Sequence, residues 1–287
     1  MYLEKVTYNA PKMQKDGVHL LVLGVIHGNE TCGSEGIARV IHEIDNKTIH
    51  LEKGHVTFIP VCNPGAYQKN ERYVDVNLNR ILKMHDQPKF YEEHIANELV
   101  PLIGAHDFVL DLHSNHTKCD PFVFLDYPDD VSRKFCESLG VESVFTGWPD
   151  LFTDDEDYTT LACAHRAGKV SVTVECGEHH DPHSIDVAYQ CIVNALIHLG
   201  MISKSNEETQ QLPPRSNFVK MYRSFIKEKE GNLIKNWQHM DHVSEGDILA
   251  VYDDGQDEVS PINGYILLPN IGSKIGDEWF YLGTQES

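Results

Sequence analysis

The chain has 287 residues, of which 41% are hydrophobic and 24% are charged, a composition typical of a globular protein with a large core. Its formal net charge of -20 at pH 7 argues against nucleic acid or an anionic membrane surface as a partner, because both require a basic face on the protein. The acidic excess also repels small anions at long range, so a site for an anionic substrate must be built from a few local arginines.

The N-terminal stretch MYLEKVTYNAPKMQ has no apolar segment behind a basic start, so we expect no signal peptide. No stretch reaches the roughly 20 apolar residues of a membrane span. The seven cysteines are scattered and form no CxxC pair, which is typical of reduced thiols acting as small buried hydrophobes. These features predict a cytoplasmic protein.

Apolar runs that predict strands alternate along the chain with amphipathic runs that predict helices. The predicted strands cover residues 20–26, 56–61, 108–112, 122–125 and 170–174. The clearest helical patterns cover residues 36–44 and 184–199. This alternation predicts an α/β fold, with a mainly parallel or mixed twisted sheet and helices on both faces.

The character of the sequence changes after the last predicted helix. Residues 203–217 are polar and contain a double proline, which is typical of a boundary between domains. Beyond them the apolar runs are short and separated by glycines, which predicts a small β-rich region. We therefore predict a main domain over residues 1–205, which would hold the catalytic site, and a small β-rich C-terminal domain over residues 206–287.

Side chains that can bind a metal follow the predicted strands at their carboxyl ends, where open α/β sheets bind ligands. His27 and Glu30 follow the first predicted strand, His113 follows the third, and Glu175 follows the last. Two histidines and a carboxylate are the usual ligands of a catalytic zinc, and a second carboxylate would be left to act as a base. We expect the first strand to deliver His27, with Glu30 in the first turn of the following helix.

The three-residue spacing of His27 and Glu30 is weak evidence by itself. His242 and Glu245 repeat the spacing in a segment that has no other feature of a site. A rival group of ligand-type side chains lies in the loop at residues 178–183, within the segment ECGEHHDPH (residues 175–183). We interpret that loop as polar surroundings of the site, and a separate metal site there is the alternative.

The segment NPGAYQKNERYVDVNLNR concentrates cations in an acidic chain, at Arg72 and Arg80. Asn79 and Arg80 side by side can grip a carboxylate, since guanidinium is a planar two-pronged donor. Arg72 could do the same or stabilise an oxyanion. The alternative is that these arginines form surface ion pairs with Glu71 and Asp75.

Four motifs in this order resemble the succinylglutamate desuccinylase and aspartoacylase family, a branch of the zinc carboxypeptidase fold. The motifs are HxxE at residues 27 and 30, NPGAYQKNERYVDVNLNR, DLHSN and VTVECG. The likeness runs from about residue 19 to residue 199. A weaker likeness links EGDILAVYDDGQDEVSPINGYILLPN to the β-domain that bacterial members carry.

The resemblance implies one zinc ion per chain, with His27, Glu30 and His113 as its ligands and Glu175 as the general base. Only the resemblance assigns Glu30 to the metal and leaves Glu175 as the base.

The resemblance also implies that Arg72 polarises the scissile carbonyl and that Asn79 and Arg80 hold a substrate carboxylate. Family members have an arginine and a tyrosine shortly before the base, and residues 158–166 match them only loosely. For the tyrosine that aspartoacylase supplies from its C-terminal domain, residues 279–281 are the candidates.

The implied function is a zinc-dependent amidohydrolase, a deacylase that hydrolyses the linear amide C–N bond of an acidic N-acyl amino acid. The alternatives are a metallocarboxypeptidase acting on short peptides and a non-catalytic binding protein on the same fold. The expected partner is a small-molecule substrate, without nucleic acid or membrane, and assembly into a homo-oligomer stays open. A C-terminal domain that narrows the entrance would favour small acyl amino acids over peptides.

Overall fold

The computed structural model describes residues 3–11, 17–151, 158–203 and 216–286. Within these residues one large mixed sheet has the strand order β1-β3-β2-β4-β7-β5-β6-β8-β14-β13-β10. Its first seven strands are β1 (Val6–Asn9), β2 (His19–Gly24), β3 (His55–Ile59), β4 (Phe108–Asn115), β5 (Phe122–Phe124), β6 (Ser143–Thr146) and β7 (Val170–Glu178). All five predicted strands are present, and β4 and β7 run three and four residues further than predicted, respectively.

The centre of the sheet is parallel, because β3, β2, β4 and β7 pair with the same direction. Among the first seven strands two pairs are antiparallel, β1 with β3 and β5 with β7, which makes the sheet mixed. Parallel strands deliver their carboxyl ends to one edge, so the residues after β2, β4 and β7 come together there. The predicted mainly parallel or mixed α/β sheet is confirmed.

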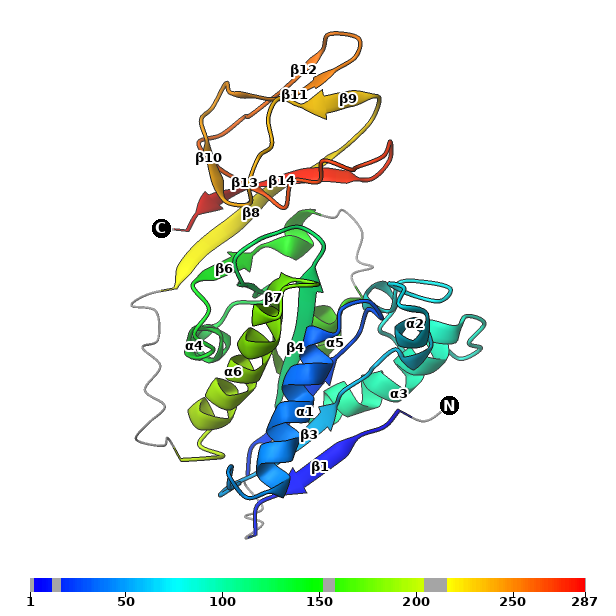
Figure 1. Ribbon diagram of the computed structural model, residues 1–287, viewed down its shortest axis with the longest axis vertical. Coiled ribbons are helices and arrows are strands. Elements are labelled where there is room, and N and C mark those ends of the chain that lie inside the picture. The colour runs from blue at the N-terminus through cyan, green and yellow to red at the C-terminus, as the bar shows by residue number, and fades with distance from the viewer. Residues whose placement is uncertain (1–2, 12–16, 152–157, 204–215, 287) are drawn as a thin grey trace.

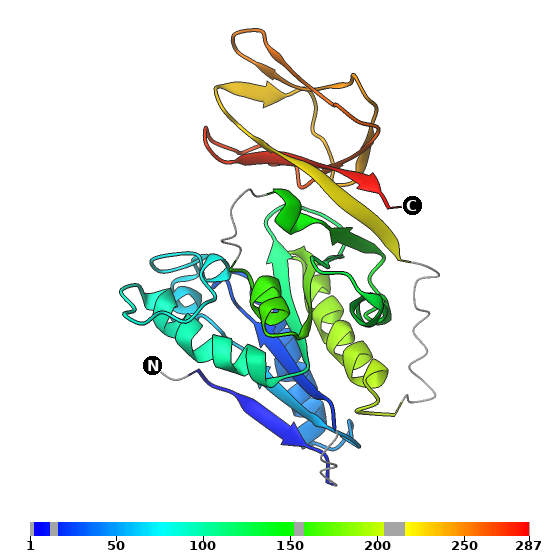
Figure 2. The same ribbon diagram turned by 180° about the vertical axis from the view of Figure 1, so that it is seen from behind.

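Helices cover both faces of this sheet (Figures 1 and 2). They are α1 (Cys32–Asp45), α2 (Pro64–Lys69), α3 (Tyr91–Ala105), α4 (Asp130–Ser138), α5 (Thr160–Arg166) and α6 (His183–His198), with short 3-10 helices η1 (Leu78–Arg80) and η2 (Trp148–Leu151). α1, α4 and α6 share one core with Leu20 and Val22 of β2, and α3 and α5 share another with Leu21 and Leu23. Successive strand residues point to opposite faces, so a sheet covered on both faces requires the unbroken apolar run of β2.

The C-terminal region is β-rich, as predicted. Its strands are β8 (Asn217–Ile226), β9 (Gly231–Leu233), β10 (Asp241–Val243), β11 (Ile248–Tyr252), β12 (Asp257–Val259), β13 (Gly264–Leu267) and β14 (Glu278–Gln285). β12, β11 and β9 form a separate three-stranded sheet among the described residues. The predicted boundary between residues 205 and 206 lies in 204–215, outside the described residues, and stays a prediction.

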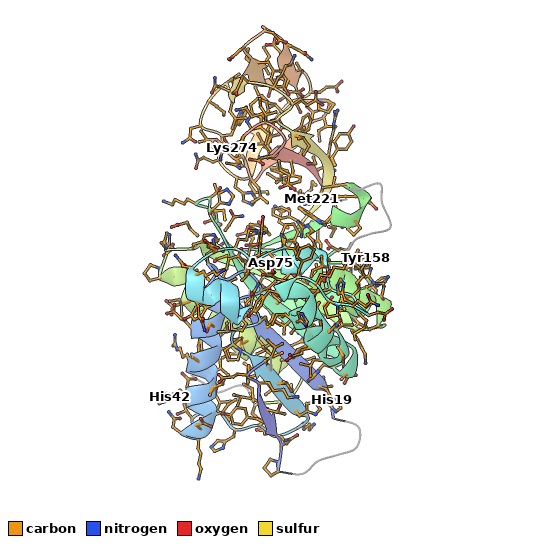
Figure 3. All side chains as sticks on the ribbon, turned by 90° about the vertical axis from the view of Figure 1, so that its right-hand side faces the viewer. His19, His42, Asp75, Tyr158, Met221 and Lys274 are labelled. Atoms are coloured by element: carbon orange, nitrogen blue, oxygen red, sulfur yellow. The ribbon has the colours of Figure 1, made fainter. Side chains whose placement is uncertain are left out.

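The large sheet continues into the C-terminal region, because β8 pairs in parallel with β6. Figure 3 shows Met221 of β8 at this junction and Lys274 in the region beyond it. Met221 packs in one apolar cluster with Phe122 and Phe145 of the main body and with Tyr281 of β14. The junction is therefore a shared core, which fixes β14 against the carboxyl edge of the main sheet.

In the part of the chain that the structure describes, the longest apolar helices fall short of what crossing a membrane requires.

Candidate metal centre and active site

The loop between β2 and α1 carries His27 and Glu30. The backbone of residues 62–72 holds it, through bonds from Cys62 N to Gly24 O (2.9 Å) and from Gly28 N to Arg72 O (3.2 Å). A Cβ on Gly28 would lie 2.1 Å from the carbonyl carbon of Ala66, so only glycine allows this approach. Glu30 lies in the loop, two residues before α1 begins, rather than in the first helical turn as predicted.

His113 and Glu175 lie within β4 and β7, which extend past their predicted ends. They are directly paired across the two parallel strands, so both side chains project from the same face of the sheet. Asp111 lies two residues before His113 on that face. Pairing thus brings together two residues that are 62 positions apart in the sequence.

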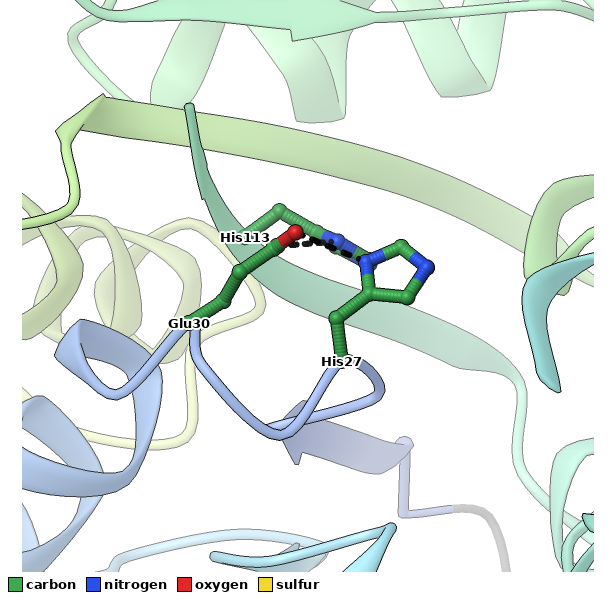
Figure 4. A group of neighbouring side chains, drawn as sticks. All are labelled: His27, Glu30 and His113. Atoms are coloured by element: carbon green, nitrogen blue, oxygen red, sulfur yellow. Dashed lines mark hydrogen bonds and ion pairs between the residues drawn. The ribbon is translucent and has the colours of Figure 1, made fainter. Parts of the chain in front are cut away.

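Three buried side chains converge where these elements meet (Figure 4). Glu30 Oε1 lies 2.8 Å from His27 Nδ1, and Glu30 Oε2 lies 2.8 Å from His113 Nδ1. Each of the three residues offers a ligand atom within 4.8 Å of the others, and each residue is 2% exposed. The structure therefore brings the three predicted metal ligands, His27, Glu30 and His113, into one cluster, which we call the metal group.

The outer ring nitrogens of both histidines have acceptors of their own. His113 Nε2 lies 2.9 Å from Asp111 Oδ2, and His27 Nε2 lies 3.0 Å from Asn77 Oδ1. An imidazole that donates from Nε2 presents a lone pair at Nδ1, here toward the Glu30 carboxylate. Imidazole nitrogens that face a buried carboxylate need either a proton or a metal ion between them, and an acceptor behind each ligating histidine is typical of zinc sites.

Glu30 is ionised in this arrangement. Although burial alone would raise its pKa, His27 and His113 hold the pKa of Glu30 well below its usual range. Although burial lowers it, the Asp111 and Glu30 carboxylates raise the pKa of His113 well above its usual range, so the imidazole is protonated until a metal ion displaces the proton. Two imidazoles and an ionised carboxylate are donors that zinc takes, so the residues present fit the predicted ion.

Asp111→Asn tests the support behind His113. The variant keeps a hydrogen-bond acceptor but loses the charge that orients and polarises the imidazole, so we expect zinc affinity to fall roughly 10- to 100-fold. Competition with a zinc-binding dye measures this affinity. Asp107→Asn, at the other end of β4 where Asp107 binds His19 N, is the matched control. Equal affinities in the two variants would show that Asp111 does not support a metal ligand.

Glu175 stands beside the metal group without belonging to it. Burial, and then the charge of Glu30, raise the pKa of Glu175 to about 7. Its Oε2 is buried and forms no hydrogen bond with any described residue. A carboxylate held this way can accept a proton near neutral pH, as a general base must.

Arg72 points into the site from the segment that precedes η1. Its Nη1 donates to Glu30 Oε1 at 2.7 Å, and 46% of its side chain is exposed. Within the described residues no ion pair joins Arg72 to Glu71 or Asp75. The surface ion pairs that the sequence left open are therefore replaced by a contact at the metal group.

A pocket of about 360 Å³ opens above the metal group. Asn79 and Arg80 line it, as do Arg72 and Glu175. The Asn79 Oδ1 accepts hydrogen bonds from the Thr160 backbone N–H (2.8 Å) and hydroxyl (3.1 Å), which leaves its NH₂ as the donor for a ligand. The pocket thus contains every residue for which a catalytic, binding or metal role was predicted.

A sequence model of the succinylglutamate desuccinylase/aspartoacylase catalytic domain matches residues 16–199. The chain belongs to this family. The family assignment from the four motifs is confirmed, and the matched range contains the metal group, Glu175 and the segment from Arg72 to Arg80.

Curated relatives match parts of the chain. A succinylglutamate desuccinylase of Pseudomonas fluorescens is 33% identical over 33% of this chain and 28% of its own length. A probable aspartoacylase of Prochlorococcus marinus is 26% identical over 62% and 60%, and an N-acyl-aromatic-L-amino acid amidohydrolase of rat is 34% identical over 36% and 35%. The chain therefore covers less than two thirds of these relatives' length.

Solved structures match nearly the whole chain. A product-bound ectoine utilization protein of Ruegeria pomeroyi has a TM-score of 0.77 at 20% identity, over 99% of this chain and 97% of that one. A succinylglutamate desuccinylase/aspartoacylase of Rhodobacter sphaeroides has a TM-score of 0.76 at 18% identity, over 94% and 86%. At these identities the likeness shows the fold of the family, including the β-rich C-terminal region.

In this family member, Tyr281 is the aromatic residue of 279–281 that lines the pocket. Trp279 and Phe280 pack instead in the core of the C-terminal region. Burial raises the pKa of Tyr281, so the side chain is a neutral phenol. The sequence could not choose among three adjacent aromatics, because the choice depends on how β14 lies against the main sheet.

Residues 158–166, the segment before Glu175 that matches the family loosely, do not place the charged side chain of Arg166 in the pocket. Arg166 lies over the Tyr158 ring, 4.8 Å from its centroid, and His165 stacks on Tyr127 at 3.9 Å. Among the described residues, Arg72 and Arg80 are the arginines that line the pocket.

The rival loop at residues 178–183 sends one side chain into the pocket, His179. The described residues contain one group that could hold a metal, His27, Glu30 and His113, so the loop does not form a second. His242 packs against Tyr265, with ring centroids 4.6 Å apart, and lies on β10, the last strand of the large sheet, away from β2 and β4. Sequence reasoning gave no role to Phe124, Trp148 and Leu161, which line the pocket and carried no signal beyond apolar character.

Proposed function

We propose that this family member is a zinc-dependent amidohydrolase that removes the acyl group from an anionic N-acyl amino acid. The observation that carries the proposal is the buried group of His27, Glu30 and His113 beside Glu175, at the base of a pocket of about 360 Å³. A pocket of this size accommodates a small molecule. Relatives named as desuccinylases, aspartoacylases and an N-acyl amino acid amidohydrolase support it.

His27, Glu30 and His113 would hold the zinc. When bound, it would act as a Lewis acid toward the amide carbonyl and lower the pKa of the attacking water. Glu175 accepts a proton from that water and passes it to the leaving amine, so one residue serves both proton transfers. Arg72 Nη1 lies at the edge of the metal group and stabilises negative charge that develops on the carbonyl oxygen.

The pKa of Glu175 sets an expected pH dependence. Its carboxyl is protonated below about 7 and cannot then act as a base, and the positive charge of a bound zinc would move this pKa downward. We expect kcat/KM to rise with pH to a plateau, with a midpoint at or below about 7. A pH–rate profile measures this, and activity that falls as the pH rises through this range would contradict the assignment.

Asn79 and Arg80 would bind the carboxylate of the amino acid. Arg80 Nη1 donates to Asn79 O at 2.9 Å, and the Arg80 side chain lies over Trp148, 5.7 Å from the ring centroid. These contacts hold the guanidinium at the pocket wall while it stays exposed enough to receive a ligand.

Arg80→Leu should weaken recognition of the carboxylate. Because Arg80 is exposed, water screens its charge, and we expect about a 10-fold loss in kcat/KM, smaller than for a buried pair. The loss should appear with an N-acyl amino acid and shrink with its C-terminal amide. Arg166→Leu, which changes an arginine outside the pocket, is the control. If Arg80→Leu lowers kcat/KM equally for the acid and the amide, Arg80 has a structural role and does not bind the carboxylate.

The second candidate function is a metallocarboxypeptidase. The contribution of Leu268, Asn270 and Tyr281 from the C-terminal region to the pocket wall favours small substrates over peptides. The zinc-loaded protein should be incubated with N-acyl amino acids and with short peptides. Turnover of peptides alone would favour the carboxypeptidase, and binding without turnover of either class would favour a non-catalytic protein.

A further inference from the structure

His179 lies at the pocket wall just beyond the end of β7. Its backbone N–H donates to Asn115 O at 2.9 Å, and its Nδ1 lies 2.8 Å from Ser114 Oγ. Ser114 is itself buried, and its backbone N–H donates to Glu30 Oε2 at 3.2 Å. The imidazole is therefore held in a fixed position relative to the metal group, through both its main chain and its ring.

The second ring nitrogen of His179 remains for a ligand. No described residue forms a hydrogen bond with its Nε2, although the ring lines the pocket. Burial lowers the pKa of His179, so the imidazole is neutral at neutral pH and offers one donor and one acceptor. Because the Ser114 hydroxyl can either donate or accept, Nε2 can take the opposite role to suit the group it meets.

Arg72 identifies the side of the pocket on which His179 lies. Ser114 and Glu30 link His179 to Arg72. Ser114 contacts the His179 ring through its hydroxyl (2.8 Å) and donates its backbone N–H to Glu30, and Glu30 Oε1 accepts from Arg72 Nη1 at 2.7 Å. In the proposed reaction Arg72 acts on the scissile carbonyl oxygen. The acyl chain and the amino-acid part both start at that carbonyl carbon. Since Asn79 and Arg80 would take the carboxylate of the amino-acid part, the acyl chain is the part of the substrate left for His179.

The two walls of the pocket differ in chemistry. The wall near Arg72 is polar, with Ser114, Asn115, His116 and His179. Around Arg80 the lining has the aromatic rings of Phe124, Trp148 and Tyr281, together with the polar side chains of Asn79 and Glu278. An alkyl chain bound against the polar wall would remove water from the polar groups there without replacing the lost hydrogen bonds. A chain that ends in a hydrogen-bonding group would replace them.

We propose that His179 binds the far end of the acyl group through Nε2, with His116 beside it, and that the acyl group carries a hydrogen-bonding group at that end. This inference rests on the proposed amidohydrolase function and adds the chemistry of the acyl group. Ser114 is the positioning residue, because it acts by holding the His179 ring.

The test compares three acyl groups on the same amino acid with the zinc-loaded enzyme. N-succinyl ends in a carboxylate and N-succinamoyl ends in a neutral amide. N-(4-methylpentanoyl) has a similar shape but no polar atoms at its far end. For His179→Phe we expect roughly a 10- to 100-fold loss of kcat/KM with a polar acyl group and little change with the alkyl one. If His179→Phe lowers kcat/KM for only one of the two polar substrates, that substrate carries the end group that His179 binds.

His180→Phe is the matched control, because His180 is the exposed neighbour on the same loop and lies outside the pocket. It should leave all three activities unchanged. His179→Gln, which keeps a donor and an acceptor, should recover part of the preference for polar acyl groups and guards against misfolding of the phenylalanine variant. Ser114→Ala should raise KM for the polar substrates more than it lowers kcat, because the ring loses its anchor.

Two failures are distinguishable. If the zinc-loaded wild type hydrolyses none of the three substrates or any other N-acyl amino acid, the proposed function is wrong. If the wild type hydrolyses them but His179→Phe lowers kcat/KM equally for all three, or for none, His179 does not bind the far end of the acyl group and the inference is overturned.

Discussion

Glu175→Gln is expected to lower kcat by roughly 10²–10⁴-fold, the usual cost of losing a general base. The glutamine keeps the shape of the side chain beside His113, its partner across β4 and β7, but it cannot accept a proton. Since Glu175 is not one of the three converging ligands, zinc content should hardly change. Steady-state kinetics and elemental analysis of the same preparation measure the two quantities.

Glu178→Gln is the matched control for this experiment. Glu178 ends the same strand, β7, and lies outside the pocket lining. A Glu175→Gln variant that retained most of its kcat would remove Glu175 as the base. Loss of activity in Glu178→Gln instead would move the proton transfer to Glu178.

His113→Ala should abolish stable zinc binding and, with it, turnover. The variant leaves two protein ligands, His27 and Glu30, where a catalytic zinc needs three. It also leaves Glu30 and Asp111 as buried carboxylates without the imidazole that both contact. Breaking a buried charged network costs about 3–5 kcal/mol of unfolding free energy, which denaturant titration of the metal-free proteins measures.

His242→Ala provides the control for His113→Ala. His242 has the same spacing to Glu245 as His27 has to Glu30, but it lies exposed on β10. Its loss should change neither zinc content nor activity. If the folded wild type contains no zinc, and added zinc neither binds nor supports turnover, the assignment of the metal site is wrong for all three ligands.

The sequence by itself determined the fold class and the central strands of the main sheet. An apolar run such as Leu20 to Leu23 fits only a strand covered on both faces, and the structure divides those four residues between two cores. The residue types of the site were also predictable, because the carboxyl ends of parallel strands meet at one edge. His27 follows such a strand, and His113 and Glu175 lie in the last residues of two others. The periodicity of an apolar run and the side chains that follow it are local properties, so local sequence carries them.

Only the tertiary structure decided which distant segments complete the pocket. The parallel pairing of β6 with β8 joins the C-terminal region to the main sheet and turns Tyr281, rather than Trp279 or Phe280, into the pocket. His179 likewise stood in the sequence as one of several polar residues in a loop, and its bond to Ser114 singles it out. Pairing and contact between segments depend on the packing of the whole chain, and no periodicity within one segment encodes them.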